Sequence, residues 1–146
     1  MVSRKFLVMA ILLGASAGGA AAQTVGEGGR KLQTVLTGAA ERPGPGDADG
    51  TGTAKVTVNP GQSRVCYELT VSNNAPATAA HIHEAGPNAA GPVRVGLAAP
   101  ADGDSSGCVD ISRELALEIL KNPGDYYVNV HNPAFPGGAV RGQLAK

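Results

Sequence analysis

The amino-acid sequence indicates an all-β domain, an antiparallel Greek-key β-sandwich with one short crossover helix. Short segments rich in valine, threonine and tyrosine recur between clusters of glycine, proline, asparagine and aspartate, a pattern typical of strands joined by tight turns. The segment 64–72 alternates regularly, so that Val65, Tyr67 and Leu69 would face the core. The strands that we expect are 32–37, 51–58, 64–72, 78–84, 92–98, 126–131 and 139–145.

The helix is expected from Ser112 to Lys121. Ser112 is a suitable N-cap residue, and Leu115 and Ile119 would form an apolar stripe along one side. Pro123 follows the segment and would end it. We therefore interpret this helix as a structural crossover between strands, and no residue pattern in it points to chemistry.

The N-terminal residues have the features of a secretory signal peptide. Arg4 and Lys5 precede an apolar run, 6–13, that is shorter than the roughly 20 residues of a membrane-spanning helix. Small residues then lead to a cleavage site after Ala22. We expect a periplasmic or secreted protein without an integral membrane segment after cleavage. Its parts would be a signal peptide over 1–22, a flexible leader over 23–31 and one domain over 32–146.

Charge and cysteine content narrow the class of protein further. The chain has 12 basic and 12 acidic residues, no tryptophan and no cluster of basic residues, which argues against binding to nucleic acid. Its two cysteines, Cys66 and Cys108, would form a disulfide in an oxidising compartment. Closing a loop of this length stabilises the fold by roughly 4 kcal/mol.

All three histidines of the chain lie in two β-type segments, which makes them the best candidates for a functional site. His81 and His83 are two residues apart, so they project from the same face of their strand while Ile82 faces the core. In the second segment, Tyr127 and His131 would lie on that same outer face, together with Asn129. If the two strands are neighbours, the three imidazoles converge.

Three neutral imidazoles suit zinc or copper at about 2.0 Å and leave a fourth position open. His81, His83 and His131 are therefore the predicted metal ligands, with Glu84, Tyr127 and Arg141 as residues that could surround them. Asp125 is a further carboxylate that could orient a ring. The alternative is a purely structural cluster, in which the histidines hydrogen-bond to carbonyls or to Glu84.

Four ordered motifs resemble the CHRD (chordin) domain family, as found in single-domain exported proteins of the bacterial type. The motifs are His81-Ile82-His83, Gly91-Pro92-Val93, Tyr127-Val128-Asn129-Val130-His131 and Arg141-Gly142-Gln143-Leu144, and the opening is similar too, with Leu36-Thr37-Gly38, Glu41, Pro43 and Gly50-Thr51-Gly52. The resemblance spans about residues 32–145. It implies a fold rather than an activity, because the family includes both the repeats of chordin, an extracellular antagonist of growth-factor signalling, and lone exported domains.

The chain departs from the family pattern just before its last motif. Ala139 stands where an acidic residue is common, so a carboxylate partner for Arg141 is lost at that position. Phe135 and Pro136 lengthen the preceding turn. These differences put in doubt any role borrowed from the family for position 139.

The expected sandwich is immunoglobulin-like or superoxide-dismutase-like, and the His-x-His-Glu strand is similar to a copper-ligand strand of the dismutases. Three histidines are too few for the dinuclear site of these enzymes, and also for a copper-only version, which requires a fourth imidazole. A shared fold, in any case, does not transfer chemistry. No nucleophile with an identifiable base appears in the sequence, so no catalytic residues are predicted.

Two functions from different classes remain. The first is an exported binding module for a copper or zinc ion. The second is a structural or protein-interaction domain of the envelope or extracellular matrix, without a metal. The expected partner is accordingly a metal ion or an extracytoplasmic protein.

Overall fold

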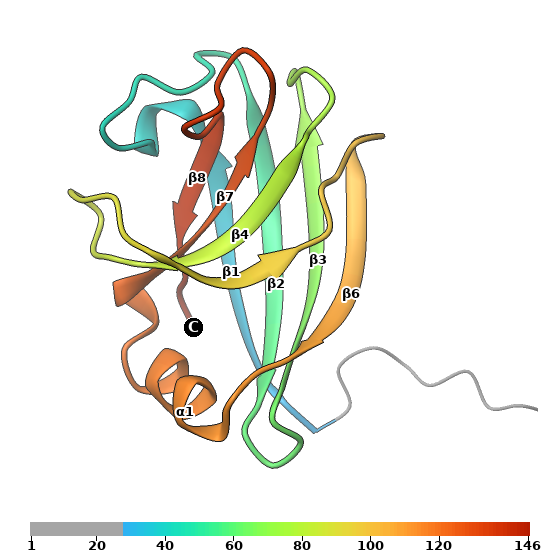
Figure 1. Cartoon of the computed structure of the whole chain (residues 1–146), viewed down its shortest axis with the longest axis vertical. Coiled ribbons are helices and arrows are strands. Elements are labelled where there is room, and N and C mark those ends of the chain that lie inside the picture. Colours follow the sequence, from blue (N-terminus) through green and yellow to red (C-terminus); the bar gives the residue numbers. More distant parts are fainter. Residues whose placement is uncertain (1–27) are drawn as a thin grey trace, which may run out of the picture.

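The computed structural model describes residues 28–146 (Figure 1). The predicted signal peptide, residues 1–22, lies outside them, as does most of the predicted leader. The strands are β1 (Arg30–Thr37), β2 (Thr51–Asn59), β3 (Arg64–Ser72), β4 (Ala79–Glu84), β5 (Val93–Leu97), β6 (Asp104–Asp110), β7 (Tyr126–His131) and β8 (Val140–Gln143). One α-helix, α1 (Arg113–Lys121), and two 3₁₀ turns, η1 (Gly38–Ala40) and η2 (Pro123–Asp125), complete the elements. No helix of the described part is long and apolar enough to cross a membrane.

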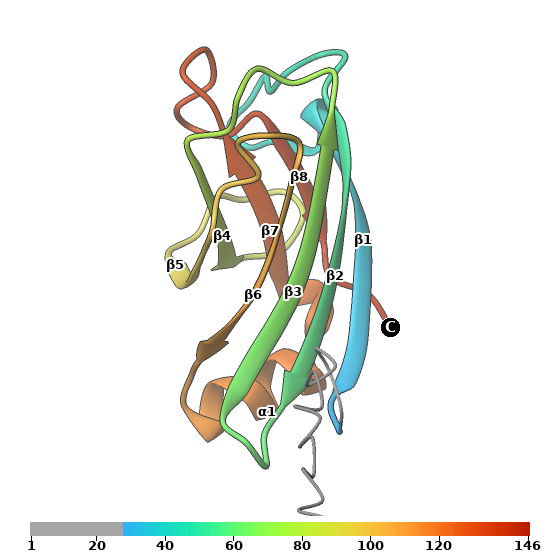
Figure 2. The same ribbon diagram turned by 90° about the vertical axis from the view of Figure 1, so that its right-hand side faces the viewer.

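The eight strands form one antiparallel sheet in the order β5-β4-β7-β8-β1-β2-β3-β6. The sheet folds over, so that β4, β5, β7 and β8 form one layer and β1, β2 and β3 the facing layer (Figure 2). The layers are joined where Thr37 of β1 pairs with Arg141 of β8, and the edge strands β5 and β6 approach each other on the opposite side. The chain crosses between layers after β3, β5 and β6, as in a Greek key. The predicted all-β Greek-key sandwich is thus confirmed, in the form of a flattened and nearly closed barrel.

The apolar core lies between the two layers because each strand alternates its side chains. Ile82 of β4 and Val128 and Val130 of β7 are fully buried from one layer. Val56 and Leu69 meet them from the other layer, as the alternation in 64–72 predicts. Burial of each such side chain stabilises the fold by about 1.5–3 kcal/mol.

Helix α1 closes one end of the barrel, where it packs beside the lower ends of β2 and β3 at the lower left of Figure 1. The backbone N–H of Leu115 donates to the Ser112 hydroxyl over 3.1 Å, so Ser112 is the N-cap. Leu115 and Ile119 face the core, with Ala116 beside them. The predicted crossover helix is therefore confirmed, together with its start and its buried face.

Strand β6 is the one strand that the sequence did not predict. It contains Ser105, Ser106 and Gly107 and alternates between exposed and half-buried positions, so it lacks the apolar alternation that marks a strand. Cys108 lies in β6 directly opposite Cys66 of β3, and the two form the expected disulfide with Cα atoms 4.0 Å apart. Strand β1 begins at Arg30, two residues before its expected start.

Removing the disulfide should destabilise the domain substantially. We expect the double variant Cys66→Ala/Cys108→Ala to lose roughly 4 kcal/mol of unfolding free energy, because the unfolded chain regains the entropy of an open loop. Urea denaturation of the two proteins measures the difference. Reduction of the wild type should reproduce the loss, and equal stability of variant and wild type would contradict the expectation.

Candidate metal centre

Strands β4 and β7 pair directly, which is the adjacency on which the histidine cluster depends. His83 lies opposite Tyr127, and His81 lies opposite Asn129. His131 ends β7 opposite Ala79, which places it diagonally across from His81. The three histidines therefore project from one face of one strand pair, as alternation within each strand predicts.

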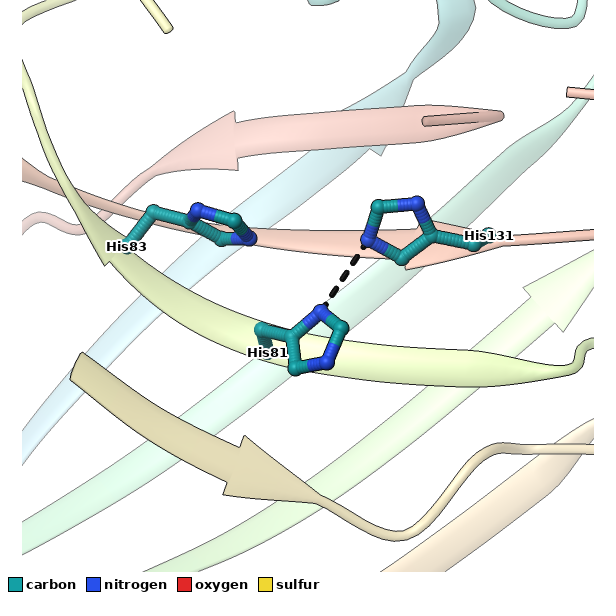
Figure 3. A group of neighbouring side chains, drawn as sticks. All are labelled: His81, His83 and His131. Carbon is teal, nitrogen blue, oxygen red and sulfur yellow. Dashed lines mark hydrogen bonds between the residues drawn. The ribbon is translucent and has the colours of Figure 1, made fainter. Parts of the chain in front are cut away.

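The imidazole nitrogens of these residues converge, as Figure 3 shows. Each ring offers one nitrogen to a group whose atoms all lie within 4.8 Å of one another, and His81 Nδ1 is 3.1 Å from His131 Nε2. Tetrahedral ligands about 2.0 Å from an ion are about 3.3 Å apart. One pair already has that spacing, and the widest separation would have to close by roughly 1.5 Å to hold such an ion.

His83 is oriented by a backbone carbonyl and leaves its other nitrogen free. Its Nδ1 lies 2.8 Å from the carbonyl oxygen of Gly91, which only accepts hydrogen bonds, so Nδ1 carries the proton. In the neutral ring Nε2 then holds a lone pair. That atom is buried without any hydrogen-bond partner among the described residues, in a side chain that is only 8% exposed. Nε2 points toward the other two rings (Figure 3).

His131 is held in the same manner from the next loop. Its Nδ1 donates to the carbonyl oxygen of Pro136 over 3.0 Å, so in the neutral ring Nε2 also carries a lone pair. His81 Nδ1 must then be the donor in the 3.1 Å contact with His131 Nε2. An ion at this point would take the place of that proton, which would move to Nε2 of His81.

Burial and neighbouring rings favour the neutral form of His81 and His131, which is the form that binds metals. Burial lowers the pKa of His81 below its ordinary value, and the neighbouring His131 and His83 lower it further. Burial likewise lowers the pKa of His131, although its hydrogen bond to Pro136 opposes the shift. Both rings are therefore ready as ligands at neutral pH.

A stack of three side chains supports His83 from behind. The Tyr127 ring lies parallel to the His83 ring, with centroids 4.8 Å apart, and the guanidinium carbon of Arg141 lies 3.4 Å from the Tyr127 centroid. Arg141 is 1% exposed and donates to the carbonyls of Ala89 and Gly86 over 2.8 and 2.9 Å. The cation thereby fixes the β4–β5 loop over the sheet, and with it the carbonyl that orients His83.

Gly91 closes this arrangement. Its carbonyl accepts from His83, and its N–H donates to the Tyr127 hydroxyl over 3.1 Å. A Cβ at this position would collide with the carbonyl of Glu84, so only glycine allows the loop to approach so closely. The glycine of the Gly91-Pro92-Val93 motif thus contributes to the site through its main-chain atoms.

Of the expected surrounding residues, Tyr127 and Arg141 lie in the stack, whereas the two carboxylates orient none of the rings. Glu84 pairs with Arg94 of β5. The Nδ1 atoms of His83 and His131 donate to main-chain carbonyls instead. Neither Glu84 nor Asp125 has a hydrogen bond to a histidine within residues 28–146, which corrects the expectation that a carboxylate would fill this role.

Glu41 is a buried acid near the site that was not among the residues predicted from the sequence. It is 3% exposed, and its carboxyl group interacts electrostatically with Arg141 without a hydrogen bond between the two. Burial raises the pKa of Glu41 to about 7, although Arg141 and the nearby Asn129 oppose the shift. The only signal in the sequence was its place in the opening motif, which does not reveal that the β1–β2 loop folds back to β8.

The fold and the site together define a β-sandwich domain in which a buried polar layer, with a three-histidine cluster, covers the outside of one sheet layer. The family model of the CHRD domain matches residues 32–144, and the chain belongs to that family. This confirms the resemblance seen in the motifs. No curated protein and no solved structure matches the chain significantly.

The Glu41→Gln variant should separate two opposite effects of pH on stability. Because folding raises the pKa of Glu41 from 4.5 to about 7, its contribution is fully present below pH 4.5 and is lost as the pH rises through 7. Glutamine mimics the protonated acid. The variant should therefore exceed the wild type by up to about 3 kcal/mol at pH 8 and match it near pH 4.5, by urea denaturation.

The pKa values of His81 and His131 shift the other way. Their pKa values are lowered from 6.5, so their contribution is present above that pH and is lost as the pH falls through the folded values. The Glu41→Gln variant lacks the titration of Glu41, so of these two effects only the loss of stability at acid pH should remain. Equal stability of the two proteins at pH 8 would contradict the assignment of Glu41.

Proposed function

We propose that this chain is an exported binding module for a transition-metal ion, copper or zinc, which His81, His83 and His131 hold. The observation that carries the proposal is the lone pair on His83 Nε2. It is buried, unpaired within the described part of the chain, and directed at two other imidazoles. A buried polar atom without a partner costs about 1–3 kcal/mol, and a bound ion would offset that cost.

The orientation of the rings supports a metal rather than a merely structural cluster. Metal-binding histidines usually donate their second ring nitrogen to a carbonyl or carboxylate, which fixes the tautomer. His83 and His131 do so through Gly91 and Pro136. Purely structural histidines would be expected to use both nitrogens in hydrogen bonds, and His83 does not.

The donor set narrows the choice of ion. Nitrogen ligands suit zinc and copper, whereas magnesium and calcium prefer oxygen. The group contains three histidines and no acidic side chain. The signal-peptide pattern of residues 1–22 supports export of the proposed module to the periplasm or the medium.

The ligand role of His83 can be tested with His83→Asn. The asparagine amide can still donate to the Gly91 carbonyl as Nδ1 does, but it offers nothing at the position of Nε2. We expect wild-type mature protein to bind one equivalent of Cu(II) or Zn(II). The variant should lose more metal affinity than the roughly 10–100-fold that is typical when a residue that only orients a ligand is replaced. Competition titration with a chromophoric chelator measures both affinities.

Thr57→Asn in β2, on the far layer, is the matched control and should bind as the wild type does. Thermal unfolding of His83→Asn without metal should show a folded protein. A flat titration of the wild type, with no metal after purification, would overturn the proposal. It would favour a structural or protein-interaction domain, in which the hydrogen bond between His81 and His131 only joins two strands.

A further inference from the structure

A second buried acceptor lies beside the histidine cluster. Asn129 is 2% exposed, and its side-chain oxygen, Oδ1, is buried without a hydrogen-bond partner among the described residues. The flanking Val128 and Val130 enter the core, so Asn129 projects from the opposite face of β7, which is the face of the histidines. Buried polar atoms normally have a partner, so an acceptor without a donor indicates a missing ion, water or ligand.

The register of β4 and β7 places Asn129 among the three imidazole rings. It lies directly opposite His81 on β4 and two residues before His131 on β7. His83 is its diagonal neighbour, because His83 pairs with Tyr127. His81 Nδ1 faces His131 Nε2 over 3.1 Å, so the nitrogens converge on the β7 side of His81. An ion held by the three rings would therefore lie next to Asn129.

The other end of the amide indicates which of its atoms faces the cluster. The Asn129 side chain lowers the pKa of Glu41 as a hydrogen-bond donor, which only its Nδ2 can be. Glu41 lies on the β8 side of β7, where a Cβ on Gly138 would collide with its carboxyl group. Strand β4 lies on the other side of β7. With Nδ2 toward β8, Oδ1 is directed toward β4 and its histidines.

A buried asparagine that only holds loops together uses both ends of its amide. Asn132 is 1% exposed; its Nδ2 donates to Asn74 Oδ1 over 2.6 Å, and its Oδ1 accepts from the Phe135 N–H over 2.9 Å. Asn129 is equally buried, yet no residue of 28–146 donates to its Oδ1. This oxygen and His83 Nε2 are thus two unpaired acceptors beside the same cluster, and a cation between them would satisfy both.

We infer that Oδ1 of Asn129 is the fourth ligand of the ion held by the three histidines, and that this oxygen makes the site selective for a divalent ion over Cu(I). The inference rests on the proposed metal-binding function and narrows it to one kind of ion. Four ligands from the protein complete the tetrahedral set that zinc takes in structural sites. An amide oxygen is a hard ligand, whereas Cu(I) prefers soft sulfur ligands, so the oxygen favours the divalent ion.

Nuclear magnetic resonance of isotopically labelled mature protein tests the contact without any substitution. One equivalent of Zn(II) should shift the resonance of the side-chain carbonyl carbon of Asn129, because the ion binds the adjoining oxygen. The same carbon of Asn122, an exposed residue at the end of α1, is the internal control and should not shift. Zinc binding that leaves the Asn129 resonance unchanged would overturn the role of Asn129 and leave the proposed function intact.

Two variants test the selectivity. Asn129→Leu keeps the size of the side chain but lacks the oxygen, so it should weaken Zn(II) binding at least about tenfold and leave Cu(I) binding within the same order of magnitude. Asn129→Asp keeps an oxygen at the same place and adds a negative charge, so it should bind Zn(II) at least as tightly as the wild type. Asn122→Leu is the matched control and should bind both ions as the wild type does. Competition with chelators of known affinity, without oxygen for Cu(I), measures each constant.

Rescue by aspartate separates a ligand from a residue that only packs, because both variants disturb the packing. Equal losses of Zn(II) and Cu(I) affinity in Asn129→Leu would overturn the selectivity, and weaker Zn(II) binding by Asn129→Asp would overturn the ligand role. Thermal unfolding without metal shows whether each variant is folded. If Asn129→Leu does not fold, the Zn(II) affinity of Asn129→Asp and the wild-type resonance decide. A wild type that binds neither ion would overturn the proposed function together with this inference.

Discussion

The pairing of β4 with β7 is the constraint on which the rest of the site depends. These strands bury both faces, since Ile82 and Val130 enter the apolar core while Tyr127 and Asn129 are buried on the other side. A strand pair covered on both faces cannot slip by one residue, because a slip would exchange polar and apolar side chains across the sheet. The register that places His81 opposite Asn129 is thereby fixed by burial on two sides.

The cover on the outer face is polar, and this has an energetic cost. Arg141 is almost fully buried without a paired carboxylate in hydrogen-bond contact, and its donors are satisfied by loop carbonyls and by Gln143. Glu41 is buried nearby, and burial raises its pKa to about 7. Buried charges that are only partly compensated usually reduce stability. The core between the layers and the disulfide supply stability that this polar layer does not.

Much of the fold follows from local patterns in the sequence. Alternation defines β3 and both histidine strands, and the N-cap at Ser112 defines the start of α1. Strand β6 was missed because its small polar residues carry no periodic signal, and its place is set by pairing with β3 along its whole length. Only the cysteine at 108 linked that segment to the sheet before the fold was known.

Like the fold, the candidate site could be predicted in part from local patterns in the sequence. Side-chain period gives the shared face of His81 and His83, but no local pattern shows that β7 lies beside β4. The covering loops were beyond prediction for a related reason. Glu41 and Arg141 are separated by most of the domain in sequence, and their proximity depends on the return of the β1–β2 loop, whose Asp47 N–H donates to the Ala139 carbonyl.

Main-chain oxygens of Gly91 and Pro136 set the angles of two imidazole rings. Such acceptors do not depend on the identity of the residue that provides them, only on the path of the loop. An insertion or deletion between β7 and β8 could therefore misalign the cluster even in a chain that keeps every histidine. Loop length, more than the number of histidines, would then distinguish chains whose three imidazoles converge from chains in which they do not.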